Sequence, residues 1–232
     1  MRESDICEIR NLPIFADMAE SAFARLHRGA YVQTFPPQVD LFHEGEASDF
    51  LHVLTAGQVE LFATWNRRET TMEIVTPVSS FLLAATIQDA PFLCSARTLE
   101  KSRVVLLPSE NVRDVFDEDR AFARAVVREL AASYRGVVKS SKNIRLRSSI
   151  ERLANYLLRY QDLAGGAESF ALPLEKRKIA SLLGMTPENL SRALRTLGEY
   201  GVQNDGQSIT ICDRGPLLRL AKPARLIDDP SS

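Results

Sequence analysis

Residues 173–198 constrain the fold of this chain most, because they combine two short helical patterns with a tight turn. The first pattern, residues 174–183, ends at Gly184, which can adopt the left-handed conformation that closes a helix. The second begins with Thr186 and Pro187, a capping hydroxyl followed by a proline in the first turn. Two short helices joined in this way are typical of a helix-turn-helix.

The second helix, expected to run to about Tyr200, carries polar side chains off its apolar face. Glu188 lies in the first turn, which enters the major groove in helix-turn-helix docking, and its carboxylate can accept from cytosine N4. Arg192 can reach guanine O6 and N7 and can also pair with Glu188 four residues earlier. The alternative is a solvated helix face with an ordinary ion pair. The agreement of cap, turn and core spacing favours DNA reading, and the rest of the predicted DNA-binding set is Thr186, Asn189, Ser191, Arg195, Lys176, Arg177 and Lys178.

The segments around this motif complete a predicted domain over residues 148–222. A helix is expected at residues 149–160 because its apolar positions share one face. A β-hairpin is expected downstream, around the turn Asp205-Gly206, and would be the wing of a winged helix-turn-helix. Residues 223–232 are expected to be a loose tail.

Charge is divided unevenly along the chain. Residues 1–138 hold 14 Lys and Arg against 20 Asp and Glu, a net charge of −6, whereas residues 139–232 hold 15 against 10, a net charge of +5. The basic part is the candidate for a polyanionic partner. A solvated surface that happens to be basic explains the charge alone equally well.

The first half of the chain has a β pattern. Residues 30–108 contain short β-branched or aromatic runs, and turn-forming residues such as Pro36-Pro37 and Ala56-Gly57 separate them. Such spacing predicts an antiparallel sandwich or barrel, preceded by a helix at residues 14–28. The β domain is therefore expected to occupy residues 1–109.

Residues 110–147 have the period of a long helix with a heptad stripe. One amphipathic helix packed on its own domain would explain the stripe. The spacing favours a parallel pair of helices, and therefore a homodimer. Polar Ser141 and Ser148 weaken the C-terminal end of the seam, whose predicted dimerisation residues are Ala123, Val127, Leu130, Tyr134, Val137 and Ile144.

The order of these parts resembles the CRP/FNR family of bacterial transcription regulators. Residues 41–46 (LFHEGE) and 54–61 (LTAGQVEL) resemble its β-roll motifs, and residues 183–192 (LGMTPENLSR) resemble its recognition segment. The resemblance implies an α+β fold, with a cyclic-nucleotide-binding-like β-roll, a dimerisation helix and a winged helix-turn-helix. It also implies a homodimer that acts on double-stranded DNA and with RNA polymerase.

Glu188, Ser191 and Arg192 match the E-x-x-S-R pattern of the FNR-like branch of this family. That branch reads palindromes with TTGAT-like half-sites. The resemblance therefore implies an operator of this kind for the present chain.

Two departures from the family argue against its best-known effectors. Ser79-Ser80 stands where cyclic-nucleotide binders have Gly-Glu, and Cys94 stands where they have the arginine that neutralises the phosphate. Arg97 is close by, but if this segment is a strand, alternation directs its side chain to the other face. Cyclic AMP and cyclic GMP are therefore not expected, since a buried phosphate would lack its charge partner. An FNR-type iron–sulfur cluster is not expected either, because Cys7 is the sole cysteine near the N-terminus.

The sequence leaves the effector open. An apolar group in the former nucleotide region could line a pocket for haem or a hydrophobic small molecule, with His27, His43, His52 or a cysteine as an axial ligand. The same residues could be packed core, Cys94 could be a redox thiol, or there could be no ligand. A cyclic-nucleotide receptor with an altered binding cassette is the remaining alternative. The candidate effector residues are Phe81, Leu82, Leu83, Phe92, Leu93 and Cys94.

Several classes of protein are excluded at this stage. No Ser/His/Asp order, HExxH, P-loop or GxGxxG supports catalysis, so an enzyme is not expected. The three cysteines include no CxxC pair, so a metal site is not expected. With no signal-peptide core and no apolar run of membrane-spanning length, the chain is expected to be a cytoplasmic protein that does not associate with membranes.

Overall fold

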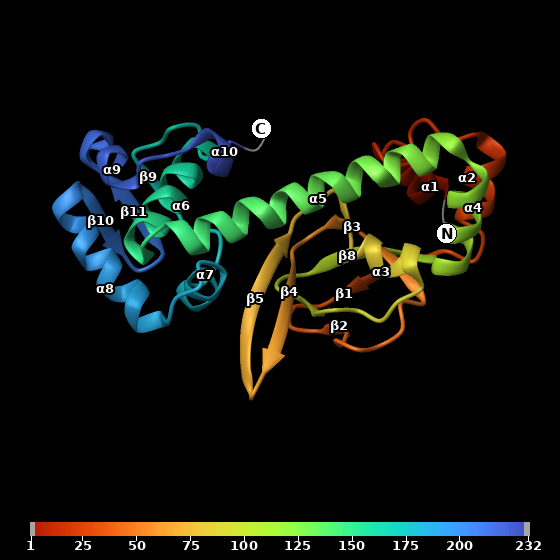
Figure 1. The fold of residues 1–232 in the computed structure, drawn as a ribbon, viewed down its shortest axis with the longest axis horizontal. Helices are drawn as coiled ribbons and strands as arrows, with labels where there is room; N and C mark the ends of the chain where they lie inside the picture. Colours follow the sequence, from red (N-terminus) through yellow and green to blue (C-terminus); the bar gives the residue numbers. More distant parts are fainter. Residues whose placement is uncertain (1–2, 230–232) are drawn as a thin grey trace. The chain divides into compact units, whose positions relative to one another are not determined.

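The computed structural model describes residues 3–229, which divide into two compact units between Tyr134 and Arg135. The helix α5 (Arg120–Leu146) begins in the first unit and ends in the second (Figure 1). The sequence instead places domain boundaries after residues 109 and 147. Within residues 3–229, no helix combines the length and the apolar character needed to cross a membrane.

Two four-stranded antiparallel sheets form the N-terminal unit. The first contains, in spatial order, β1 (Tyr31–Phe35), β8 (Ser102–Pro108), β3 (Phe50–Ala56) and β6 (Ser79–Phe81). The second contains β2 (Asp40–Phe42), β7 (Ser95–Thr98), β4 (Val59–Trp65) and β5 (Arg68–Val75). The hairpin β4–β5 is the longest in this unit (Figure 1). The expected antiparallel β domain is therefore confirmed.

Helices cover the outer face of the first sheet. Side chains from β3 and β8, including Leu51 and Leu107, pack against Phe15, Phe23 and Phe122 of the helical layer. On their opposite faces the same strands meet the second sheet. Because both faces are covered, β3 and β8 are buried almost continuously rather than alternately. The helices of this layer are α1 (Glu3–Arg10), α2 (Glu20–Leu26), α3 (Leu83–Gln88), α4 (Ser109–Glu118) and the start of α5.

The N-terminal helices differ from the sequence prediction. The helix expected at residues 14–28 is only α2, because the residues before it form turns whose carbonyl oxygens at Phe15 and Met18 accept hydrogen bonds from Arg10. The helix α1 was not predicted. Strands β6 and β7 also escaped prediction, because they are very short and are defined by pairing with distant strands.

Asp119 divides the expected single helix of residues 110–147 into α4 and α5. Its carboxylate caps α5 by accepting from Phe122 N at 2.8 Å, and it also accepts from Ala19 N, at the start of α2, at 3.0 Å. The hydrogen bond from the Phe122 amide is the main cause that holds the pKa of Asp119 below its ordinary value. Its backbone N–H donates to the Val115 carbonyl of α4 at 2.8 Å, so one buried residue joins three helices.

The C-terminal unit contains the remaining elements. Its sheet has the spatial order β10-β11-β9 and antiparallel pairing. Ser148 caps α6 by accepting from Glu151 N, and Glu151 reaches back to Ser148 N, a complete capping box. The elements are α6 (Ser149–Leu163), β9 (Ser169–Ala171), α7 (Lys176–Leu182), α8 (Pro187–Leu197), the 3₁₀ turn η1 (Gly198–Tyr200), β10 (Val202–Asp205), β11 (Ser208–Ile211), α9 (Arg214–Ala221) and α10 (Arg225–Asp228).

The buried guanidinium of Arg152 connects α6 to two other parts of this unit. It donates to the carbonyl oxygens of Leu183 (2.8 Å) and Gly184 (3.3 Å) in the turn between α7 and α8. It also donates to the carbonyl oxygens of Arg147 (2.7 Å) and Ile144 (3.3 Å) at the end of α5. The turn before α8 is therefore fixed relative to the junction of α5 and α6.

The end of the chain is more ordered than the sequence predicts. The prediction of a loose tail over residues 223–232 is wrong for the described part, because residues 225–228 form α10 and Asp228 binds Arg147 at 2.6 Å. Residues 230–232 lie outside the described chain. An ion pair between residues so far apart in sequence leaves no local pattern.

We expect Asp119→Ala to destabilise the N-terminal unit by about 1–2 kcal/mol, because the start of α5 loses its cap. Urea denaturation followed by circular dichroism measures this change. Because its pKa is lowered in the folded state, the wild-type carboxylate contributes stability above the ordinary value of 3.8, and this contribution is lost as the pH falls through the lower folded value. Asp117→Ala, at an exposed position in α4, is the control and should change stability by less than about 0.5 kcal/mol. Equal effects of the two substitutions would contradict the capping role.

Candidate nucleic-acid interface

The turn between α7 and α8 has the geometry that the sequence predicts. Gly184 adopts φ +62°, which a side chain would strain. Thr186 caps α8 by accepting from Asn189 N at 3.2 Å, and Pro187 occupies the first turn. The inner face of α8 is buried through Leu190, Ala193, Leu194 and Leu197. The opposite face is therefore held toward solvent by a fixed scaffold.

Glu188, Ser191, Arg192 and Arg195 are exposed on that outer face. Arg192 donates to the side-chain oxygen of Asn189, a contact that differs from the predicted pairing with Glu188. The Ser191 hydroxyl donates to the Pro187 carbonyl at 3.0 Å. The side chains predicted to read base edges thus stand together on one helix face.

Glu188 is held in its ionised form. The pKa of its carboxyl is lowered first by a hydrogen bond from its own backbone amide, then by one from the Thr186 hydroxyl, and further by the charge of Arg192. Burial opposes this shift only in part. Near neutral pH the group is therefore an acceptor, as a partner for cytosine N4 must be.

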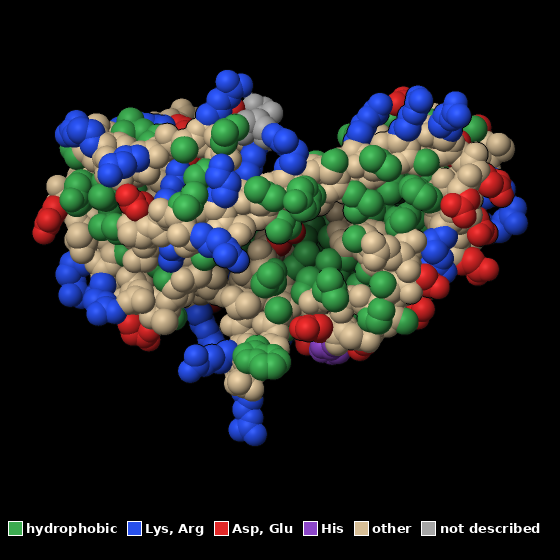
Figure 2. Space-filling view, viewed as in Figure 1, with side chains coloured by type: hydrophobic (Ala, Val, Ile, Leu, Met, Phe, Trp, Pro, Cys, Tyr) green, Lys and Arg blue, Asp and Glu red, His purple; other side chains and the backbone are tan. Residues whose placement is uncertain are grey.

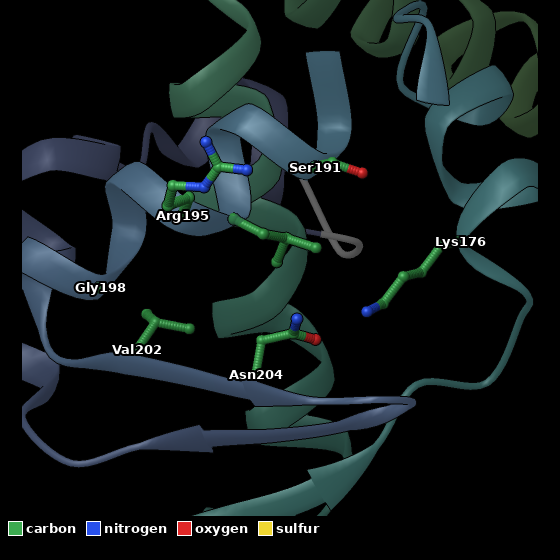
Figure 3. A pocket seen from close by; sticks show the side chains of 7 residues that line it. Lys176, Ser191, Arg195, Gly198, Val202 and Asn204 are labelled. Atoms are coloured by element: carbon green, nitrogen blue, oxygen red, sulfur yellow. The ribbon is translucent and has the colours of Figure 1, made fainter. Parts of the chain in front are cut away.

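A pocket of 390 Å³ lies beside α8, between the start of α7 and the wing (Figure 3). Lys176 extends toward Asn204 of β10 across this pocket, and Arg195 and Ser191 come from α8. Cationic and amide donors around an open pocket suit a phosphate of a nucleic-acid backbone. The sequence did not identify Asn204, although its position in the predicted wing was a signal.

The other predicted cations flank this pocket. Arg177 and Lys178 follow Lys176 in the first turn of α7, where Arg177 is exposed and Lys178 is half-buried. Lysine and arginine side chains are also spread widely over the C-terminal unit (Figure 2). The basic character of residues 139–232 is thus a property of their surface.

Apolar side chains lie exposed along α5. Val127, Tyr134, Val137 and Ile144 have 59%, 70%, 66% and 45% of their surface accessible, respectively. Hydrophobic side chains are visible along the course of this helix in Figure 2. Of the other two predicted dimerisation residues, Ala123 is half-buried, and Leu130 packs partly against the helical core of the N-terminal unit. Four of the six predicted residues thus form an uncovered stripe in a single chain.

The candidate effector residues do not form one group. Phe81, Phe92 and Cys94 are buried together between the two sheets, with Leu82 partly buried at their edge. Leu83 instead belongs to the core on the other side of the first sheet, under the helices. Leu93, expected to be in the apolar region, is 85% exposed. The expected common pocket is therefore wrong for Leu83 and Leu93.

Aromatic rings fill the space between the sheets at this point. Phe42 stacks on Phe92 with ring centroids 3.9 Å apart, and His52 packs against Phe42 at 4.8 Å and against Phe81 at 5.4 Å. Burial lowers the pKa of His52 to about 4. This histidine is consequently a neutral member of the core near pH 7.

Cys94 and Arg97 lie in different surroundings. Burial raises the pKa of the Cys94 thiol to about 11, and the nearby carboxylates of Glu44 and Glu73 add to the shift. Arg97 stands on the other face of β7, as strand alternation predicts, and pairs with Asp40 at 2.6 Å and Glu69 at 3.3 Å. Arg97 is the cation closest in sequence to the family's phosphate-binding position. It is thus already paired with two carboxylates of this chain.

The remaining two histidines lie in other parts of the unit. The ring of His27, at the end of α2, lies 2.7 Å from the Phe23 carbonyl oxygen through Nδ1. His43 is exposed after β2. The three histidines predicted as alternative axial ligands therefore occupy unrelated positions.

Residues 151–220 match the Crp-like helix-turn-helix domain, and residues 32–119 match the cyclic nucleotide-binding domain. The chain belongs to the CRP/FNR family of transcription regulators. It is therefore a DNA-binding regulator rather than an enzyme, and its predicted α+β architecture is confirmed.

Relatives of known role span most of the regulator. A CRP-like cAMP-activated global transcriptional regulator of Mycobacterium tuberculosis is 26% identical over 215 residues, 90% of this chain and 96% of that protein. The transcriptional activator protein anr of Pseudomonas aeruginosa is 20% identical over 186 residues, 78% of this chain and 76% of that protein. One of these relatives is thus described as activated by cAMP, whereas the other is described only as a transcriptional activator.

Solved structures show the same fold. A CRP/FNR-family regulator from Eubacterium rectale has a TM-score of 0.75 at 19% identity, covering 91% of this chain and 99% of that one. FixK2 from Bradyrhizobium japonicum has a TM-score of 0.70 at 22% identity, covering 84% of this chain and 98% of that one.

We expect the stability of the N-terminal unit to fall as the pH falls from 6.5 to 4, by about 3 kcal/mol in total from His52. In this pH range the imidazole of His52 is protonated in the unfolded state but stays neutral in the folded state, so acid favours unfolding. Urea denaturation at several pH values measures the slope.

His52→Phe should flatten this slope, because a phenyl ring extends the aromatic cluster and does not titrate. His43→Gln is the control, since His43 is exposed, and should leave the slope unchanged. Equal slopes for the wild type and His52→Phe would show that this histidine is not the acid-sensitive group.

Proposed function

We propose that the regulator acts as a homodimer on a palindromic DNA site with FNR-like, TTGAT-type half-sites, without control by a cyclic nucleotide. The observation that carries this proposal is the outer face of α8, where Glu188, Ser191 and Arg192 stand exposed beside a basic pocket. Each α8 would enter the major groove of one half-site, with half-site centres about 34 Å apart. RNA polymerase is the further partner that this mode of regulation requires.

The uncovered stripe on α5 supports the dimer. Large apolar side chains at heptad spacing on a surface helix are stabilised when a second helix removes them from water. A second copy of the chain offers the same spacing in the same register. Two-fold symmetry then explains why the operator would be a palindrome.

The chemistry of α8 supports base reading. Glu188 is an ionised acceptor and Arg192 is a bidentate donor, the two complementary groups that read a C·G pair in the major groove. The contact of Arg192 with Asn189 holds the guanidinium near the helix surface until a base replaces Asn189. The spacing Glu188, Ser191, Arg192 is that of the FNR-like branch.

The interior of the β domain argues against a cyclic nucleotide. Cys94 supplies no positive charge, Arg97 is paired with two carboxylates, and Glu44 and Glu73 lie near enough to raise the pKa of the thiol. A phosphate placed there would face negative charge without a cation. Adding cyclic AMP or cyclic GMP should leave DNA affinity unchanged, and a gain in affinity would contradict this part of the proposal.

The residues present do not fit a haem group. The single buried histidine, His52, is enclosed by Phe42, Phe81 and Phe92, whose rings fill the space that a porphyrin would need. Cys94 is held as a thiol by its raised pKa, whereas an axial cysteine ligand is a thiolate. A colourless protein under anaerobic conditions is the corresponding expectation, and a Soret band would oppose it.

We expect Val137→Glu to weaken the dimer by about a hundredfold or more, because it places two unpaired carboxylates against each other in an apolar seam. Sedimentation velocity at several concentrations measures the change. Ala132→Glu, five residues before Val137 and about 140° around α5, is exposed and is the control that should leave the dimer intact. If both variants remained dimers, the stripe would not be the interface.

We expect Arg192→Ala to cost about 1–3 kcal/mol for each half-site of the operator and to relax specificity at one base pair of each half-site. Affinity and specificity fall together because each protomer loses one bidentate contact to a base. Fluorescence anisotropy with the palindrome and its single-base variants measures both effects. An equal loss on all sequences would contradict base reading by Arg192.

Lys176→Ala is the matched variant, because Lys176 lines the pocket and carries charge without reading a base. It should weaken binding to all sequences alike and lower the slope of log affinity against log salt by about two, one for each protomer of the dimer. An unchanged slope would remove the phosphate contact from the proposal.

A further inference from the structure

The last described residues of the chain fold back over the C-terminal end of α5. Asp228 accepts two hydrogen bonds from the Arg147 guanidinium, at 2.7 and 2.6 Å. Lys139 donates to the Asp229 carbonyl oxygen at 2.7 Å, and Lys142 lies 3.4 Å from that of Leu226. Residues 222–229, here called the strap, are thus attached to Lys139 and Lys142 of α5 and to Arg147, directly after its end.

The central contact of the strap is specific in geometry. The Arg147 side chain is only 7% exposed, and its planar group meets the carboxylate through two parallel hydrogen bonds. The same Asp228 carboxylate accepts from Ala224 N at 2.7 Å, which closes the single turn of α10. Removal of this carboxylate would therefore release both the anchor on α5 and the fold of the strap.

The strap lies on the side of α5 away from the apolar stripe. Lys139 is two residues after Val137, and Lys142 is two residues before Ile144, which is about 200° around the helix in each case. The strap therefore leaves the proposed dimer seam open. We therefore expect the strap to act on the junction between α5 and α6 rather than on the dimer seam.

Arg147 occupies that junction, between the end of α5 at Leu146 and the start of α6 at Ser149. Its carbonyl oxygen accepts from Arg152, whose guanidinium also holds the turn before α8. A change of backbone at Arg147 is therefore passed to α8 through one side chain. The strap fixes one side of this residue, and Arg152 fixes the other.

We propose that the strap sets the position of α8 relative to α5, with Asp228 as the positioning residue and Arg147 as its anchor. The proposal rests on the proposed function, because α8 must hold a fixed place in a dimer to meet half-sites at one spacing. Without the strap the junction samples several angles. The dimer then loses affinity for the correct spacing and tolerates wrong spacings better.

The test compares the palindrome with an operator whose half-sites are one base pair further apart. We expect the wild type to prefer the correct spacing by about tenfold or more. In Asp228→Asn, and in a chain ending at Lys222, this preference should fall by about threefold or more, because a mobile junction lets α8 reach both spacings. Asp229→Asn is the control, since it removes the same charge from the adjacent residue, whose carboxylate pairs with Arg225 within the strap.

Spacing preference separates positioning from simple stabilisation. If the variants lose affinity equally for both operators, with a lower melting temperature, the strap only stabilises the unit and the proposal is overturned. An unchanged preference in both variants overturns it as well.

A second measurement does not need DNA. Nitroxide labels at Ser140→Cys on α5 and Thr196→Cys on α8, in a chain with Cys7→Ser and Cys212→Ser and diluted with unlabelled chain, give the distance distribution between the two helices. We expect a narrow distribution that broadens on Asp228→Asn, and equal widths would overturn the proposal. If the wild type bound no palindrome, the proposed function would fail while this measurement still decided the role of the strap.

Discussion

The arrangement of the C-terminal unit depends on one buried cation that has no carboxylate partner among residues 3–229. Arg152 is 9% exposed, and burial lowers its pKa. Its charge is balanced by carbonyl oxygens at the ends of α5 and α7, where the helix dipoles concentrate negative potential. Helices that end elsewhere could not satisfy this guanidinium, so a single side chain specifies where two helices stop and how they meet.

This constraint gives the helix-turn-helix its rigidity on the side away from DNA. The inner face of α8 is apolar, and the turn before it is held from behind by Arg152. The outer face can then carry Glu188 and Arg192 without a role in the stability of the domain. Stability and recognition are thus assigned to opposite sides of one eleven-residue helix.

The parts predicted correctly from sequence are those whose cause is local. The cap at Thr186, the left-handed Gly184 and the exposed face of α8 follow from residues within one or two turns of each other. The wing is predicted by its Asp205-Gly206 turn for the same reason. Such features leave a signal in any single sequence.

The parts that were missed depend on contacts between distant residues. Arg147 and Asp228 are 81 positions apart, so nothing near either residue indicates an ordered tail. The division of the candidate effector residues between two cores also follows from sheet topology, which puts Phe81 and Leu83 on opposite sides of one sheet. The sequence shows that these residues are apolar, but it does not show which side chains they contact in the folded chain.

The three-way role of Asp119 has a consequence for how the N-terminal unit opens. Asp119 ends α4 through its backbone N–H, which donates to the Val115 carbonyl, and its carboxylate caps α5 and holds the start of α2. None of these helices can therefore fray at that point without disturbing this one residue. Their amide protons should consequently exchange as one cooperative group rather than helix by helix. The helical layer then behaves as a single foldon, into which the first turns of α5 are built.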